Sequence, residues 1–257
     1  MLTVERKNII LQMVDDKSTV SVPELAKVLE VSEVTVRKML NDLDHQGLLR
    51  RTRGGAVSLQ MAVRELDEKE KEKTNIKEKR AIVKKAYAMI DDSDTIFLDA
   101  GSTTLELVKL IRNGNKRDIT VVTNALNIAY ELVSSYDIEV VVIGGLLRHK
   151  IMSCVGGITE SALSSMYFDK VFLGANSLSL ELGVTTPNLY EAQVKQSMLK
   201  SAKKAILICD SSKFGITTMA KICSLDSFDA VITDSHLSKE EQRKIKDAGI
   251  NLVIADE

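Results

Sequence analysis

The sequence predicts an α/β protein of two domains, in which a charged linker joins a small helical domain to a larger domain built on a mostly parallel β-sheet. Short helical patterns at the N-terminus end in a basic, glycine-containing hairpin. Seven basic and six acidic residues then occupy 13 of the 17 positions from 64 to 80, a segment that cannot form a core. Beyond it, β-branched runs alternate with helical patterns, which is typical of a parallel sheet covered by helices. The predicted boundaries are 1–59 for the first domain, 60–76 for the linker and 77–257 for the second domain.

Composition and charge exclude several classes of protein. Of the 257 residues, 44% are hydrophobic and 28% are charged, as expected for a soluble globular chain. The net charge of -1 argues against a uniformly basic nucleic-acid coat, so any DNA affinity must come from a local patch. The odd number of cysteines, without metal-ligand spacing, predicts reduced thiols and no metal site. With no signal peptide and no apolar run of membrane-spanning length, we expect a cytoplasmic protein without membrane contact or cofactor.

The first domain is predicted to hold three helices. Thr3 can cap the first, and Ser21 with Glu24 forms the pattern of a capping box at the second. Ser32 can cap a third helix that Gly47 ends. The last two helices are separated by about three residues, which is the spacing of a helix-turn-helix. The predicted buried positions are Ile9, Ile10, Met13, Val14, Leu25, Val28, Leu29, Val36, Leu40 and Leu43.

Basic and amide side chains gather on the outer face of the third helix and on the hairpin that follows. Arg and Asn can make bidentate contacts to bases, and a basic hairpin around Gly54 and Gly55 can lie on the phosphate backbone as a wing. Taken alone, the helix face could be an ordinary solvated surface, but the adjacent hairpin favours binding to double-stranded DNA. The candidate DNA-binding residues are Thr35, Arg37, Lys38, Asn41, Arg50, Arg51 and Arg53.

The charged linker is expected to be a solvated helix. Glu65 with Lys69 and Asp67 with Lys71 have the i, i+4 spacing of helical ion pairs. A phosphate-binding patch is the alternative, which the nearly equal numbers of acids and bases disfavour.

In the second domain, polar turns follow successive predicted strands. The strand 95–98 runs into Asp99-Ala100-Gly101-Ser102-Thr103-Thr104 and a helix, and such a turn suits a phosphate. A nucleotide loop like that of methyltransferases is a weaker alternative, because further glycines are absent. Ligands of open α/β sheets bind beyond the carboxyl ends of strands, so the turns can converge on one site. The other predicted strands are 119–122, 140–143, 171–173, 205–209, 230–233 and 252–254, and the predicted helices are 104–111, 125–133, 190–202 and 239–247.

The segment SEVTVRKMLNDLDHQGLLRRTRGGA resembles the DNA-binding signature of the DeoR family of bacterial regulators. Met39 and Arg53 depart from the residues usual in that family. The motifs FLDAGSTT, VVTNA, VIGG, FLGAN, GVTTPNLYEAQVK and DSSKFG resemble the sensor domain of the same family. The resemblance implies a fold similar to ribose-5-phosphate isomerase and coenzyme A transferases, and a phosphorylated sugar as effector. The effector-binding residues that it implies are Asp99, Gly101, Ser102, Thr103, Thr104, Thr123, Asn124, Gly145, Glu191, Lys195 and Lys213.

We therefore expect a DNA-binding repressor of a sugar or sugar-alcohol catabolic operon. Two other functions compete with this expectation. A sugar-phosphate isomerase or deaminase would need a general base, for which Glu191 and Asp210 are the candidates. An RNA-binding or nucleoid protein is disfavoured by the net charge and by the lack of exposed aromatic stacking motifs. We therefore expect no catalytic residue. Because one short helix reads too few base pairs for adequate specificity, we expect a homodimer or homotetramer.

Overall fold

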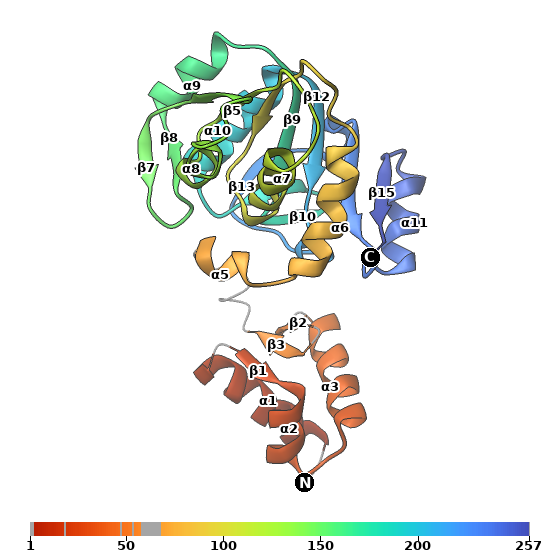
Figure 1. Cartoon of the computed structure of the whole chain (residues 1–257). Coiled ribbons are helices and arrows are strands. Elements are labelled where there is room, and N and C mark those ends of the chain that lie inside the picture. The colour runs from red at the N-terminus through yellow and green to blue at the C-terminus, as the bar shows by residue number, and fades with distance from the viewer. Residues whose placement is uncertain (1–2, 18, 47, 53, 58–67, 257) are drawn as a thin grey trace. The chain divides into compact units, whose positions relative to one another are not determined.

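The computed structural model describes residues 3–17, 19–46, 48–52, 54–57 and 68–256 of the chain. These residues belong to two compact units, Met1–Glu65 and Leu66–Glu257, whose elements Figure 1 labels. None of the described helices is both long and apolar enough to cross a membrane.

The described residues of the first unit form three helices and a small antiparallel sheet. The apolar stripes of the helices form a core around Ile10, Leu25, Leu40 and Leu49. The strands run in the order β1-β3-β2. Gly55 is required for space, because a Cβ there would lie 1.8 Å from the backbone oxygen of Val20 in the neighbouring strand. The elements are α1 (Thr3–Lys17), β1 (Thr19–Ser21), α2 (Val22–Leu29), α3 (Glu33–His45), β2 (Arg50–Thr52) and β3 (Gly55–Val57).

The predicted helix-turn-helix and the predicted capping box are confirmed. The Ser21 side chain accepts a hydrogen bond from the Glu24 amide, while the Glu24 side chain accepts one from the Ser21 amide. Ser32 caps α3 in the same manner, through the amide of Thr35. The expected end of α3 at Gly47 falls outside the described residues, and the last helical residue is His45.

A Ser21→Ala variant is expected to lose about 1 kcal/mol of stability in the first unit, because an amide at the start of α2 loses its acceptor. Chemical unfolding of the chain followed by circular dichroism measures the loss. Ser21→Thr keeps a hydroxyl and serves as the control. Equal unfolding midpoints for the Ala and Thr variants would contradict a stabilising role for the cap.

The second unit is built on seven parallel strands in the order β15-β14-β12-β9-β4-β5-β6. Successive strand residues point to opposite faces, so Phe97 packs in one core cluster while Ile96 and Leu98 pack in the other. Helices α6 (Ile76–Tyr87), α7 (Ser102–Arg112) and α8 (Leu126–Leu132) cover the second of these faces. The other face is covered with α9 (Gly157–Ser164), α10 (Leu189–Lys200) and α11 (Lys239–Asp247).

All seven predicted strands are found, which confirms the mostly parallel α/β architecture. They are β4 (Thr95–Leu98), β5 (Thr120–Thr123), β6 (Glu139–Val142), β9 (Phe168–Gly174), β12 (Ala202–Ile208), β14 (Ala230–Asp234) and β15 (Leu252–Ala255). Other strands that lie outside the predicted ranges form a hairpin of β7 (Leu146–Arg148) with β8 (Ser153–Val155) and a sheet of β10 (Ser177–Ser179), β11 (Gly183–Thr186) and β13 (Ala220–Cys223). The described part of the unit also contains two short 3-10 helices, η1 (Ser211–Lys213) and η2 (Leu225–Ser227).

The expectation of a fully solvated linker is wrong at its C-terminal part. Residues 68–72 form the short helix α5 (Glu68–Glu72), and Glu68 is only 1% exposed. Glu65 and Asp67, the acidic members of the expected ion pairs, lie outside the described residues. The charged segment thus contributes a buried side chain to the second unit.

Candidate functional site

The outer face of α3 carries the predicted cationic side chains. Val36 and Leu40 are buried in the core, which leaves Arg37 and Lys38 exposed. The Arg37 guanidinium forms an ion pair of 2.6 Å with Glu33 one turn earlier. Exposed pairs of this kind contribute little to stability, so Arg37 can exchange Glu33 for another acceptor. Both residues are therefore available to a ligand on this face.

The wing is tied to α3 by side-chain contacts. The Arg51 guanidinium donates to the Asn41 side chain, and the Arg51 amide donates to Asp44 at 3.0 Å. Asn41 and Arg51 are thus brought together from two elements. Thr35 lies in the first turn of α3, where its hydroxyl contacts that of Ser32. Among the remaining predicted residues, Arg50 lies in β2 and Arg53 lies outside the described residues.

A pocket in the second unit lies at the carboxyl ends of the central parallel strands. The sheet order places β4 beside β9. From β4 the chain continues through β5 and β6 to one edge of the sheet, and from β9 it continues through β12, β14 and β15 to the other edge. Such a switch point is the usual ligand site of open α/β sheets. The pocket and the open solvent at its mouth together span about 540 Å³. The turns after β4, β9 and β12 contribute Ala100, Gly101, Ser102, Thr103, Gly174, Ala175, Asn176, Cys209, Asp210 and Lys213.

One wall of the pocket is the start of α7. Gly101 precedes the helix, and Ser102 and Thr103 form its first turn. The first amides of a helix have no partner within it, and together with the helix dipole they attract anions. The residues predicted to bind an anion therefore lie together at the start of a helix that lines the pocket.

Lys195 of α10 is fully engaged by protein acceptors. Its ammonium lies 2.6 Å from Asp99, 2.9 Å from the Gly174 carbonyl and 3.5 Å from Glu191. Burial opposes the charge of Lys195, but the carboxylates of Asp99 and Glu191 outweigh it and raise its pKa. Three acceptors match the three donors of an ammonium. Lys195 therefore holds Asp99, Glu191 and the Gly174 backbone together within the site.

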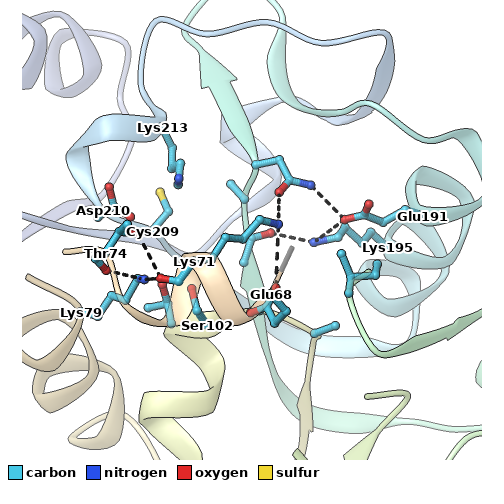
Figure 2. Close-up of a pocket in the computed structure, with 17 residues that line it drawn as sticks. Glu68, Lys71, Thr74, Lys79, Ser102, Glu191, Lys195, Cys209, Asp210 and Lys213 are labelled. Atoms are coloured by element: carbon cyan, nitrogen blue, oxygen red, sulfur yellow. Dashed lines mark hydrogen bonds and ion pairs between the residues drawn. The ribbon is translucent and has the colours of Figure 1, made fainter. Parts of the chain in front are cut away.

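Two other lysines that line the pocket have ammonium groups with fewer hydrogen-bond acceptors than that of Lys195. Figure 2 shows Lys213 reaching in from η1 and Lys71 from α5. Lys71 donates to the Asn176 side chain at 3.1 Å and lies 3.8 Å from a Glu68 oxygen. Among the described residues, no acceptor contacts the Lys213 ammonium within hydrogen-bond distance. These two cations are the strongest candidates to contact an anion.

Both carboxylates considered as general bases are held by neighbouring cations and hydroxyls, Glu191 by Arg148 and Thr186 and Asp210 by Ser212. Although burial favours their neutral forms, neighbouring lysines and hydroxyls lower the pKa of both Glu191 and Asp210. Lys195 is the main cause at Glu191, and Lys213 is the main cause at Asp210. A carboxylate with a lowered pKa is a weak base at neutral pH. The nearby thiol of Cys209 is also unreactive, because burial raises its pKa far above the usual range.

Not every residue carried over from the resemblance lines the main pocket. The buried Thr104 and Thr123 hydroxyls each donate to a backbone carbonyl, of Gly101 and Leu98 respectively. Gly145 is needed for space, since a Cβ there would lie 2.1 Å from the Thr159 hydroxyl oxygen. These three positions support the surrounding loops.

A smaller cavity beside the main pocket is lined by Asp99 and Asn124. The Asn124 amide group donates to Ser153 at 2.9 Å and to the Cys154 carbonyl at 2.7 Å. Its buried side-chain oxygen has no hydrogen-bond partner among the described residues. Of the predicted effector residues, the main pocket brings together Gly101, Ser102, Thr103, Glu191, Lys195 and Lys213.

Sequence reasoning did not assign any residue of the charged segment to this pocket. Glu68, Lys71, Thr74 and Lys79 all line it. The density of lysines in the segment was the available signal, because it raised the alternative of a phosphate-binding patch. Near-equal numbers of acids and bases do not distinguish residues that turn inward from residues that face solvent.

Comparison with known proteins connects both units to regulators. Residues 6–62 match the family described as DeoR-like helix-turn-helix domain, and residues 74–235 match the DeoR C terminal sensor domain. The chain is 37% identical to the HTH-type transcriptional regulator GlpR of Haloferax volcanii, over 98% of each protein. It is 33% identical to the lactose phosphotransferase system repressor of Staphylococcus epidermidis, over 93% of this chain and 95% of that protein. A ribose 5-phosphate isomerase A structure from Methanocaldococcus jannaschii matches 55% of each chain with 16% identity and a TM-score of 0.39.

Proposed function

Because this chain belongs to the DeoR family of transcriptional regulators, we propose that it represses a sugar or sugar-alcohol catabolic operon under the control of a phosphorylated sugar. Its first unit binds operator DNA through α3 and the wing. Its second unit binds the effector in the pocket at the switch point of the sheet. The active species is a homodimer or homotetramer, so that two or more copies of α3 read separate half-sites.

The observation that carries this proposal is the combination of cations and a helix start in one pocket. Gly101, Ser102 and Thr103 offer backbone amides and hydroxyls, and Lys213 adds an ammonium without a described acceptor. Charge-assisted hydrogen bonds of this kind are the strong contacts to phosphate. Carboxylate and amide groups of Glu191 and Asn176 on the same lining suit sugar hydroxyls. The name of the lactose repressor among the relatives supports a sugar-related role.

Effector and operator are proposed to act on one another by linkage. If the effector changes operator affinity by some factor, the operator changes effector affinity by the same factor. A thermal-shift screen of sugar phosphates identifies the effector, because a ligand of the native state raises its stability by mass action. Titration of that compound into the operator complex then measures the coupling. A full screen without a single stabilising sugar phosphate would contradict the proposed effector class.

Lys213→Ala is expected to weaken effector binding by about 1.5–3 kcal/mol, or roughly 10- to 150-fold, because it removes one charge-assisted contact. The Ser102→Ala, Thr103→Ala double variant should lose less, since its backbone amides remain. Both variants keep the first unit intact and should bind operator normally but need more effector to respond.

The measurement is operator binding titrated with the identified sugar phosphate. Lys221→Ala is the control, because Lys221 is an exposed residue of β13 outside the pocket lining. If Lys213→Ala and the double variant gave the effector curve of the control, the phosphate would have to be held elsewhere.

A further inference from the structure

The helix α5 and the residues that follow it line one side of the pocket and are attached to the second unit at several points. The Glu68 amide donates to the Lys150 carbonyl at 3.0 Å, and the Asn75 side chain donates to Asp210 at 2.9 Å. The buried Lys79 ammonium donates to the Thr74 carbonyl at 2.7 Å and to the Lys71 carbonyl. Asp210 itself lines the pocket. The position of α5 therefore depends on contacts made at the pocket wall.

The Glu68 carboxylate is buried in this wall and poorly compensated. One of its oxygens lies 3.8 Å from the Lys71 ammonium, beyond hydrogen-bond distance. The other oxygen is buried and has no donor among the described residues. Burial accordingly raises the pKa of Glu68. An ionised carboxylate held in this way costs free energy that a better-matched arrangement would recover.

Lys71 is the cation that this carboxylate faces. Its ammonium is half-buried and makes its hydrogen bond to the neutral amide of Asn176 rather than to a carboxylate. Burial lowers the pKa of Lys71, and the distant Glu68 only partly offsets the effect. A phosphate presents more charge and more acceptor oxygens than a single carboxylate. Lys71 would therefore gain from exchanging Glu68 for a phosphate.

We propose that Glu68 is an internal competitor of the effector's phosphate, and that an anion entering the pocket takes over Lys71 and displaces Glu68 together with α5. This inference rests on the proposed function, because it assumes that the pocket binds a phosphorylated ligand. It adds two residues to those proposed to respond to the effector. Lys71 contacts the phosphate directly, and Glu68 is the group that the phosphate displaces.

The position of Glu68 in the chain gives this exchange a regulatory consequence. The first unit ends at Glu65, only three residues before Glu68. Glu68 is the first described residue after the segment that joins the two units, so α5 adjoins the covalent connection to the DNA-binding unit. A ligand can shift the equilibrium between two arrangements only by its difference in affinity for them. Expulsion of Glu68 supplies that difference, because the anion and the carboxylate cannot occupy the same cationic site.

The test compares the full-length chain with Glu68→Gln, using inorganic phosphate as the probe. Glutamine keeps the shape of the side chain and removes its charge, so phosphate should bind about tenfold more tightly once the competing anion is gone. Glu70→Gln is the matched control, because Glu70 is an exposed carboxylate of the same helix and should leave the affinity unchanged. Calorimetry measures the three affinities. Lys71→Met should weaken phosphate binding in either background.

Hydrogen exchange of the unmodified chain provides an independent readout. With phosphate, the amides of residues 102–104 should become more protected, while the Glu68 amide and the amides of residues 73–74 should exchange faster. Phosphate binding that protects 102–104 but leaves α5 unchanged, with equal affinities for Glu68→Gln and Glu70→Gln, would overturn the inference and leave the proposed function standing. Failure of every variant to bind phosphate would overturn the proposed function and the inference together.

Discussion

Lys195→Met is expected to destabilise the second unit by about 3–5 kcal/mol, the usual cost of removing one partner of a buried ion pair. Asp99 and Lys195 are 2% and 3% exposed, and their charged atoms are 2.6 Å apart. Methionine is unbranched and nearly as long as lysine, but it donates no hydrogen bond. The variant leaves Asp99 without its cation, while Glu191 keeps the neighbouring Arg148 at 3.0 Å.

Thermal and urea unfolding followed by circular dichroism measure this loss. A change of this size corresponds to a fall in Tm of roughly 6–20 °C for a unit of 150–250 residues. Lys200→Met is the control, because Lys200 is an exposed residue near the end of the same helix. An unfolding midpoint equal to that of the control would show that the buried pair contributes nothing to stability. Adding Asp99→Asn to Lys195→Met should recover part of the loss, since no unpaired charge then remains.

The Arg37→Ala, Lys38→Ala double variant is expected to lose about 2–6 kcal/mol of operator affinity, if each side chain contributes the 1–3 kcal/mol typical of a base contact. Both residues are exposed on α3, and the only described ion pair of Arg37 is the weak surface pair with Glu33. Stability should therefore change little. The DNA probe is a duplex site selected from a random library by the unmodified protein.

The salt dependence of binding separates the two kinds of contact. Loss of a phosphate contact lowers the slope of log affinity against log salt concentration by about 0.9, whereas loss of a base contact relaxes sequence preference. Arg243→Ala, Lys246→Ala removes the same charge from exposed positions of α11 and serves as the control. Equal operator affinity in the two double variants would remove α3 from the proposed interface.

Most elements of both units were predictable because their signals are local, but the helices α6 and α9 were not among the predicted ones. The caps at Ser21 and Ser32 and the buried positions Leu25 and Leu40 follow from residues within one or two turns of each other. The seven parallel strands follow in the same way from short β-branched runs. The antiparallel strands β7, β8, β10, β11 and β13 were not predicted, because their short segments lack the longer apolar, β-branched runs that mark the parallel strands. Such short runs carry little periodicity.

The candidate ligand site was predictable as a region and less so residue by residue. Parallel strands end at one edge of a sheet, so the turns holding Ser102 and Lys213 were expected to converge, and they line one pocket. Lys195 was expected to balance a phosphate, but its donors are taken by Asp99, Glu191 and Gly174. A motif identifies a lysine without showing which acceptors surround it. That information depends on residues about 100 positions apart in the chain.

By itself the sequence determined the two-domain organisation, the type and order of the main elements, and the family to which the chain belongs. These properties depend on local periodicity, capping and motif order. Only the tertiary structure decided the role of the charged segment, whose Glu68 and Lys71 turn toward the pocket although their neighbours Lys69 and Glu70 face solvent. The reason is physical: the energy of a charge depends on its burial and on the distance to its partners, and neither quantity is encoded in the spacing of residues along one segment.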